Sequence, residues 1–300
     1  MGRAVPFVQA DIFTTRAFAG NPAGAVLEAD GLTEADMSRI AAEMRLAGTC
    51  FITRATTAGA VHRLIYRSPT REIPYSGHTT LGGVHALLEA GRLGAGEAVF
   101  DTAIGLLPVS VERREGATVM WLAPRVEPPR ALPAPLPPLL AALGLPPEAV
   151  GDWARPALTA DADVLLPVAG LDALHALRPD MAALAAVAAA HGLRGACVVS
   201  RETVEPTSVS HCRFFAPTFG IPEDIVTGSV HSPIGVWLFK AGLLHADGAL
   251  VAFTAEQGDS LGRPGRLRVE LQLQDGTVAR VRVGGSAITV LEGSIAVPDA

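Results

Sequence analysis

The sequence predicts an α+β protein built from two similar halves. Three observations lead to this prediction: a long internal repeat, more strand-like than helix-like segments, and a proline-rich stretch near the middle of the chain. Strand-like and helix-like segments do not alternate strictly, which favours α+β over a doubly wound α/β sheet.

The repeat relates two helical segments, residues 77–91 and 228–242. The first begins Gly-His-Thr-Thr, the second begins Gly-Ser-Val-His, and both end with Ala-Gly. Each residue of the second segment lies 151 positions after its counterpart in the first. Solenoid repeats have periods of roughly 20–50 residues, so this spacing indicates two pseudo-symmetric domains instead. We expect a ligand cleft between them, with one helix start from each domain facing it.

Two further segments have helical signals. Residues 33–46 begin with the capping residue Thr33, followed by acidic residues and then apolar residues at helical spacing. Residues 179–191 form an Ala-rich segment that Gly192 ends. The strand-like runs are residues 4–8, 49–53, 61–66, 106–111, 119–122, 196–200, 213–215, 267–273, 278–283 and 287–291.

The domain boundary is expected in residues 124–138. Seven of these fifteen residues are proline, so the stretch is predicted to be neither helix nor central strand. The last strand is expected to return to the first domain, because a short terminal run rarely stands alone. The predicted domains are residues 1–123 with about 284–300, and residues 124–283.

The charge and the apolar segments of the chain argue against two classes of binding partner, nucleic acids and membranes. The net charge of -6 argues against nucleic acid, and the apolar runs are shorter than the ~20 residues of a membrane span. The three cysteines show neither metal-ligand spacing nor a disulfide pattern. Residues 1–8 lead directly into a strand and do not resemble a signal peptide. We therefore expect a reduced cytoplasmic protein.

The two glycine-led helix starts are the first candidates for a binding site. A helix N-terminus presents unpaired N–H groups and the positive end of its dipole, which suits a carboxylate or phosphate. Gly77 and Gly228 let the backbone approach a ligand, with His78 and Ser229 as neighbouring donors. The glycines could instead only make tight turns, but their equivalent positions favour a shared anion site.

Several titratable residues lie near these helix starts. His78 can act as acid, base or donor near neutral pH. Asp224 could orient a substrate or act as a base, or it could only stabilise the helix dipole. His231, the counterpart of Thr80, either lines the cleft or caps a turn. Three other side chains are expected to have no catalytic role, His85 and His211 as packing residues and Glu223 as a solvated neighbour.

The sequence lacks the usual signatures of nucleotide, metal and serine-hydrolase sites. It has no Gly-x-Ser-x-Gly, no His-Glu-x-x-His, no Walker loop and no Gly-x-Gly-x-x-Gly after a strand. No cofactor and no metal are therefore expected, and cofactor-free proton chemistry or simple binding remains.

Five blocks of the sequence resemble the PhzF-like isomerases of phenazine biosynthesis, within the wider diaminopimelate-epimerase fold. The resemblance implies two domains, each a barrel-like sheet around a central helix, and a homodimer. The blocks are residues 11–14 with 18–23, 67–69 with 72–81, 213–217 with 220–224, 227–231, and 256–258 with 262–264.

The resemblance also assigns residues to the cleft. Gly77, His78, Asp224, Gly228 and Ser229 match the family's residues there. Ser76 replaces a cysteine that related epimerases use, so two-cysteine racemase chemistry is not expected. The predicted substrate-binding residues also include Ser76, Thr49 and His231.

One departure from the family concerns its acid/base. Family members have a Glu where this chain has Gly48, and glycine has no side chain to titrate. Loss of a positioned acid/base costs roughly 10²–10⁴ in rate. His78, Asp224, His231 and Cys50 are candidates to replace it, of which we favour His78 with Asp224. Gly48 could also make room for a bulkier substrate.

The sequence thus predicts an isomerase that shifts a double bond in a small cyclic amino or imino carboxylic acid, in specialised metabolism such as antibiotic biosynthesis. The alternatives are a catalytically silent small-molecule binding protein on the same fold and, with less support, a lyase or dehydratase.

Overall fold

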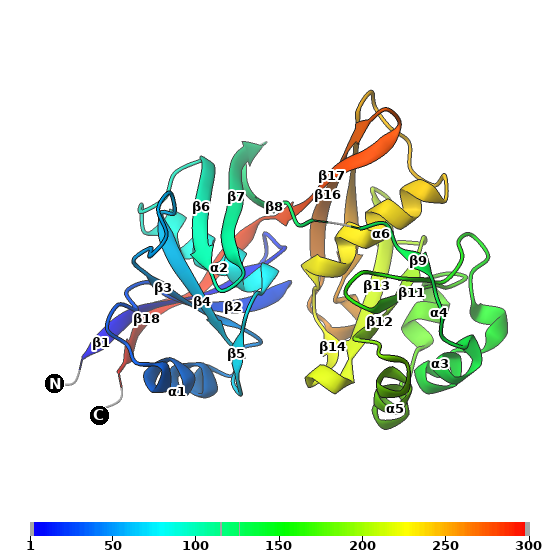
Figure 1. Ribbon diagram of the computed structural model, residues 1–300, viewed down its shortest axis with the longest axis horizontal. Coiled ribbons are helices and arrows are strands. Elements are labelled where there is room, and N and C mark those ends of the chain that lie inside the picture. Colours follow the sequence, from blue (N-terminus) through cyan, green and yellow to red (C-terminus); the bar gives the residue numbers. More distant parts are fainter. Residues whose placement is uncertain (1–2, 115, 126, 298–300) are drawn as a thin grey trace. The chain divides into compact units, whose positions relative to one another are not determined.

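The computed structural model describes residues 3–114, 116–125 and 127–297. The chain divides into two compact units. Unit 1 comprises Met1–Ala123 and Gly284–Ala300, and unit 2 comprises Pro124–Val283. Each unit contains a curled sheet and one long helix that packs against it, α2 in unit 1 and α6 in unit 2 (Figure 1).

The sheet of unit 1 has the strand order β18–β1–β2–β3–β4–β6–β7–β8. The pairs β2–β3 and β4–β6 are parallel, and the other pairs are antiparallel. Helix α2 contacts strands β1, β2, β3, β4, β8 and β18, so the sheet curls around it. The elements are β1 (Ala4–Ile12), β2 (Asn21–Val26), α1 (Glu34–Met44), β3 (Thr49–Thr53), β4 (His62–Arg67), β5 (Glu72–Ile73), α2 (Gly77–Glu89), β6 (Gly96–Thr102), β7 (Gly105–Arg114), β8 (Ala117–Leu122) and β18 (Ala287–Ala296).

The sheet of unit 2 has the order β9–β10–β11–β12–β13–β15–β16. Its run β11–β12–β13–β15–β16 repeats the parallel and antiparallel pairings of β2–β3–β4–β6–β7, as the sequence repeat suggests. The elements are β9 (Arg130–Ala131), α3 (Leu136–Leu143), β10 (Ala157–Leu158), β11 (Asp163–Pro167), α4 (Leu171–Ala176), α5 (Met181–His191), β12 (Gly195–Ser200), β13 (Ser208–Ala216), β14 (Ile221–Asp224), α6 (Gly228–Lys240), β15 (Leu250–Gln257), β16 (Gly265–Gln274) and β17 (Thr277–Gly285), with short 3-10 turns at Pro147–Ala149, Pro217–Phe219 and Asp259–Leu261.

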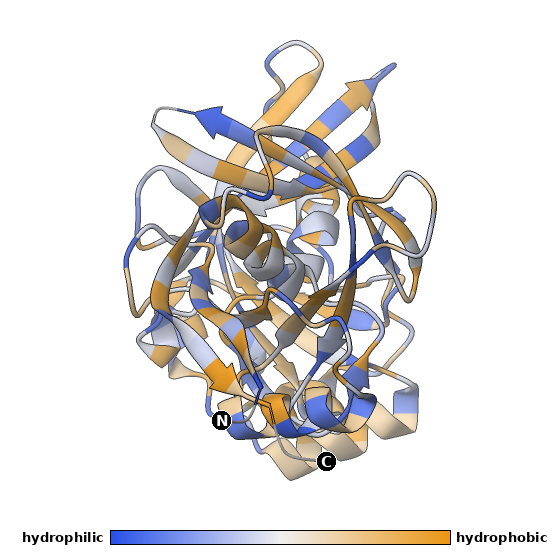
Figure 2. Cartoon of the chain, turned by 90° about the vertical axis from the view of Figure 1, so that its left-hand side faces the viewer, coloured by the Kyte–Doolittle hydropathy of each residue, from blue (hydrophilic) through white to orange (hydrophobic). Residues whose placement is uncertain are grey.

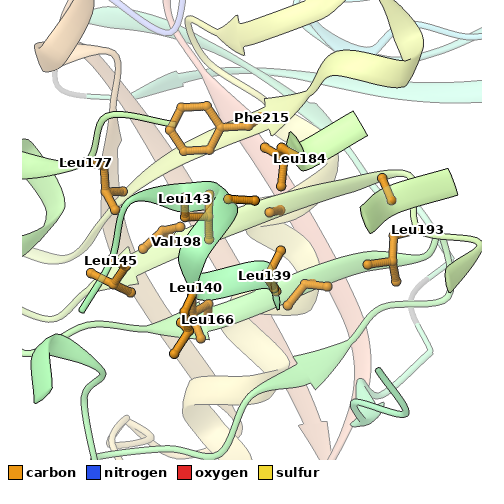
Figure 3. Close-up of a cluster of buried hydrophobic side chains, with 14 of the residues drawn as sticks. Leu139, Leu140, Leu143, Leu145, Leu166, Leu177, Leu184, Leu193, Val198 and Phe215 are labelled. Carbon is orange, nitrogen blue, oxygen red and sulfur yellow. The ribbon is translucent and has the colours of Figure 1, made fainter. Parts of the chain in front are cut away.

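Apolar side chains form a core on each side of the sheet in unit 2. Leucines of α3 and α5 pack with Val198 and Phe215 from the sheet (Figure 3). A second cluster joins the sheet to α6 through Val230, Ile234 and Leu238. Hydrophobic and hydrophilic residues alternate along several strands on the side shown in Figure 2, whereas β11 and β12 of unit 2 are buried along their whole length. The second cluster packs α6 against its sheet.

The predicted helices are present, with ends shifted by a few residues. Thr33 caps α1 and forms a capping box with Asp36. The prediction that residues 124–138 contain no helix is wrong at their end, because α3 begins at Leu136. Pro137 and Pro138 fit its first turn, where a missing N–H removes no helical hydrogen bond. Helix α4 was not expected from the sequence.

The described part of the chain is mixed and dominated by strands, which confirms the predicted α+β class. No helix in the described ranges combines the length and apolar character needed to cross a membrane.

Candidate active site

The first group of candidate residues lies at the start of α2. We call Ser76, Gly77, His78 and Thr79 the α2 half-site. Its first three residues are half-buried and Thr79 is fully buried. The Ser76 and Thr79 hydroxyl oxygens are 2.8 Å apart. The His78 ring places Nδ1 3.4 Å from Ser76 Oγ and Nε2 3.4 Å from Thr79 Oγ1.

Gly48 lies directly beside this half-site. A Cβ at Gly48 would overlap Oγ1 of Thr79 and lie 3.2 Å from both the Cβ and the Cγ2 of that residue. The space of a side chain at position 48 is therefore occupied by a hydroxyl-bearing side chain from α2. The sequence reasoning did not single out Thr79, whose counterpart in the repeat is Val230.

The second group of candidates lies at the start of α6. We call Asp224, Thr227, Gly228 and Ser229 the α6 half-site. Strand β14 ends at Asp224, and the Thr227 hydroxyl donates a 2.6 Å hydrogen bond to Oδ2 of that carboxylate. Asp224, Gly228 and Ser229 are half-buried, so each exposes some surface. The arrangement fixes a carboxylate one turn of chain before the helix start.

A buried glutamine supports the α6 half-site from behind. Gln257 Oε1 accepts hydrogen bonds from the Thr227 N–H at 2.9 Å and from His231 Nε2 at 3.2 Å. Its Nε2 donates to the Asp224 carbonyl at 2.9 Å. His231 is fully buried and also lies 3.7 Å from Cys212 Sγ. His231 therefore contacts the residues behind the start of α6, and its side chain exposes no surface there.

The two central helices begin differently from α1 and α5. Thr33 and Asp180 cap α1 and α5 with side-chain hydrogen bonds to the first turn. Ser76 and Thr227 occupy the equivalent position of α2 and α6, but neither makes a side-chain cap hydrogen bond. Their hydroxyls bind Thr79 and Asp224 instead. The first-turn N–H groups of α2 and α6 therefore donate no hydrogen bond to the side chain of their cap residue.

An arginine stabilises the chain before each helix start. Arg67 on β4 pairs with Glu72 on β5 at 3.1 Å. Arg213 on β13 pairs with Glu223 through two 2.8 Å hydrogen bonds. The expectation that Glu223 is a solvated neighbour is wrong, because this carboxylate is largely buried and ion-paired. Glu72 and Glu223 are 151 positions apart, the spacing of the repeat, whereas the two arginines are 146 positions apart.

The remaining candidates are buried inside the units. The Thr49 hydroxyl is fully buried and has no hydrogen-bond partner among the described residues. Burial raises the pKa of the Cys50 thiol, which lies under Gly83 of α2 and is a poor acid/base there. His85 bonds Thr289 at 3.0 Å, and His211 bonds Glu256 at 2.9 Å, as expected of packing histidines. In the described ranges, no group of three or more His, Cys, Asp or Glu side chains is placed to hold a metal ion.

Comparison with known proteins places this geometry in a family. The family described as phenazine biosynthesis-like protein matches residues 10–293. The chain belongs to this family. An uncharacterized isomerase from Mesorhizobium japonicum is 33% identical over 296 residues, covering 95% of this chain and 96% of that protein. The trans-2,3-dihydro-3-hydroxyanthranilate isomerase of Pseudomonas fluorescens is 27% identical over 294 residues, covering 96% and 98%.

A solved structure agrees with the sequence matches. The Bacillus anthracis phenazine biosynthesis protein of the PhzF family superposes with a TM-score of 0.88 at 25% identity, covering 98% of this chain and 99% of that one. Both of these relatives are named isomerases, and this chain is a member of the same family. The predicted family and fold are thereby confirmed.

Proposed function

We propose that this phenazine biosynthesis-like isomerase shifts a double bond in a small cyclic amino or imino carboxylic acid. The observation that carries the proposal is the pair of helix starts at Gly77 and Gly228, whose first-turn N–H groups donate no hydrogen bond to the side chain of the cap residue. The name of the Pseudomonas fluorescens relative supports the substrate class, because a dihydro-hydroxyanthranilate is a ring carboxylic acid with an amino group.

His78 and Asp224 carry the proton in this proposal. His78 is half-buried, and both of its ring nitrogens lie near hydroxyls. Asp224 is half-buried and held by Thr227. One group removes a proton from carbon, and the other protonates the far end of the conjugated system, so that no oxidant is required. Gly77, Gly228 and Ser229 bind the carboxylate. Thr49 and His231, which the sequence predicts to be substrate-binding, are fully buried and have no part in holding the carboxylate in this proposal.

The test follows hydrogen exchange at carbon. The protein is incubated in D₂O with cyclic unsaturated amino acids, including dihydroanthranilates and dehydroprolines, and C–H signals are followed by NMR. We expect deuterium at one carbon, with a loss of roughly 10²–10⁴ in rate in His78→Gln and in Asp224→Asn. Exchange that persists at full rate in both variants would overturn the assignment of the two residues.

Gly48 supports a second candidate, a binding protein without turnover. The space of a side chain at position 48 is filled by Thr79, so no carboxylate can replace the missing acid/base there without rearrangement. A binding protein would show ligand-dependent shifts in its own NMR spectrum and no deuterium in the ligand. The same experiment therefore separates the two functions.

Size-exclusion chromatography with light scattering tests the homodimer expected from the family.

A further inference from the structure

The amide of Gln257 can adopt only one orientation. Its Oε1 faces the N–H of Thr227 at 2.9 Å, and its Nε2 faces the carbonyl oxygen of Asp224 at 2.9 Å. A backbone N–H can only donate, and a backbone carbonyl can only accept. Turning the amide over would therefore set two donors against each other and two acceptors against each other. Because Gln257 is fully buried, bulk water cannot replace these partners.

This orientation determines the direction of the Thr227 hydroxyl. The second hydrogen of Gln257 Nε2 is donated to Thr227 Oγ1, which lies 3.1 Å away, and an amide nitrogen cannot accept in return. The Thr227 oxygen therefore accepts from Gln257, and its own proton is directed to Asp224 Oδ2 at 2.6 Å. Two successive hydrogen bonds thus both donate towards the Asp224 carboxylate.

The two hydrogen bonds favour the charged form of Asp224. A distance of 2.6 Å lies within the range of about 2.5–2.7 Å that is typical of a hydroxyl bound to an ionised carboxylate. A proton on Oδ2 would have to point at the Thr227 oxygen, and the Thr227 proton would then lose its acceptor, since Gln257 presents only N–H on that side. Hydrogen bonds to the charged form of an acid favour that form.

The neighbouring charges act in the same direction. Glu223, the residue before Asp224, is ion-paired with Arg213, so its negative charge is balanced. Arg194, which pairs with Asp163, also attracts Asp224 electrostatically. Both arrangements are compatible with a carboxylate at position 224 before a substrate arrives.

We infer that Asp224 is the member of the proposed pair that removes the proton from carbon, and that Thr227 and Gln257 hold its carboxylate for this step. The inference rests on the proposed isomerase function. A group that begins the reaction without a proton cannot deliver one, so His78 delivers the proton to the second carbon. Thr227 and Gln257 act through Asp224 and are positioning residues.

The protons of one turnover balance. The Asp224 carboxylate takes a proton from carbon, and the electron pair of that C–H bond stays in the conjugated system. Protonated His78 gives its proton to the second carbon, while Thr227 keeps its own. Asp224 then releases a proton to water and His78 takes one up, which both can do because both are half-buried and expose some surface. No proton is consumed, and no oxidant is required.

This assignment narrows the class of substrate. A carboxylate is a weak base towards carbon, so the C–H bond that Asp224 breaks must be activated by conjugation with a C=C or C=N bond. Conjugated cyclic amino or imino acids meet this condition. Saturated cyclic amino acids such as L-proline do not, and we expect no exchange of the proline α proton.

The first measurement needs no ligand. The Thr227 hydroxyl proton is followed by ¹H NMR and is assigned by its loss in Thr227→Val. A buried hydroxyl bound to a charged oxygen exchanges slowly with water and resonates downfield. We expect the signal to move upfield in Asp224→Asn, in which an amide replaces the carboxylate. Asp172→Asn, at an exposed position of the same unit, is the control and should leave the signal in place.

The second measurement assigns the direction of proton transfer. The cyclic acid that exchanges fastest in the D₂O experiment is labelled with deuterium on the carbon that loses its proton, and its conversion in H₂O is compared with that of the unlabelled compound. Thr227→Val slows removal, so we expect a rate roughly 10–100-fold lower and a larger isotope effect than in the native protein. His78→Gln slows delivery, which brings the isotope effect towards one. Thr227→Ser keeps the hydroxyl and should keep both native values.

The outcomes separate the inference from the function. The inference is wrong, although the isomerase function stands, if Asp224→Asn leaves the hydroxyl signal unchanged or if Thr227→Val keeps the native rate and isotope effect. It is also wrong if the isotope effect falls in Thr227→Val and rises in His78→Gln, or if the proline α proton exchanges. If no compound of the D₂O experiment exchanges, the isomerase function fails, and the assignment of Asp224 fails with it whatever the hydroxyl signal shows.

Discussion

Gly48 and Thr79 are packed so closely that any side chain at position 48 would collide with the threonine. The ideal Cβ position at Gly48 overlaps Thr79 Oγ1 and lies 3.2 Å from two of its carbon atoms. Both residues are buried, so neither can move into solvent to relieve the overlap. The two positions therefore constrain each other, and the missing acid/base and the α2 half-site are parts of one structural feature.

The first prediction is that substitutions at Gly48 and Thr79 are not additive. Gly48→Ala should lower the free energy of unfolding by about 1–3 kcal/mol, as overpacking of a core typically does. Thr79→Ala removes the Oγ1 and Cγ2 atoms that collide, so the double variant should recover most of that loss. Urea unfolding of the four proteins gives the coupling energy. Purely additive losses would show that the two side-chain positions do not collide.

The second prediction concerns restoring the family's acid at position 48. Gly48→Glu alone should reduce deuterium exchange into a substrate, because its side chain must displace Thr79 from the α2 half-site. Adding Thr79→Ala to that variant makes room for the glutamate, and exchange should rise above that of Gly48→Glu. The rates of deuterium exchange into the substrate are measured by NMR for the native protein and both variants at the same protein concentration. A Gly48→Glu protein faster than the native one would mean that Thr79 moves aside at little cost.

The third prediction concerns Gln257, the buried support of the α6 half-site. Gln257→Leu leaves the Thr227 N–H and the His231 Nε2–H without their acceptor. An unsatisfied buried group costs about 1–3 kcal/mol, so the variant should lose at least that much stability. Thermal unfolding measures the loss, and deuterium exchange should fall with it because the Asp224 carbonyl also loses its donor. Gln274→Leu, at an exposed position, is the control and should change neither quantity.

The elements that the sequence predicted well have local signals. Thr33 and Asp36 form a capping box whose partners are three residues apart, and Gly192 ends α5 in the left-handed conformation. The starts of α2 and α6 could be predicted because the same residue pattern occurs at both positions in the chain. The start of α3 at Leu136 could not be predicted, because the seven prolines of residues 124–138 argue against a helix. Two of these prolines lie in the first turn of α3, where a helix tolerates them.

The residues that the sequence could not assign act through long-range contacts. Thr79 matters because Gly48, thirty-one positions earlier, leaves room for it. Gln257 bonds to Asp224 and Thr227 across about thirty positions, and no periodic pattern records such a pairing. Gly83 and Cys50 form another long-range contact of this kind. A Cβ at Gly83 would lie 2.7 Å from the thiol sulfur of Cys50, so a larger residue does not fit at position 83. Local sequence patterns thus predict where the two helix starts lie, whereas the residues that pack against them are known only from the structure.

The last prediction is a loss of stability in acid that depends on Glu256. Burial alone would raise the pKa of this carboxyl, but hydrogen bonds from His211 and from the N–H groups of Val204 and Glu205 outweigh burial and lower its pKa from 4.5 to about 2. A lowered pKa contributes stability above pH 4.5, and that contribution is lost as the pH falls towards 2. It amounts to roughly 3 kcal/mol at neutral pH. Urea unfolding between pH 7 and pH 2 should show Glu256→Gln to be less stable than the native protein at neutral pH and less sensitive to acid. The control Glu43→Gln, at an exposed position on α1, should follow the native protein. Parallel pH curves for native protein and Glu256→Gln would show that the buried carboxylate is not the acid-labile group.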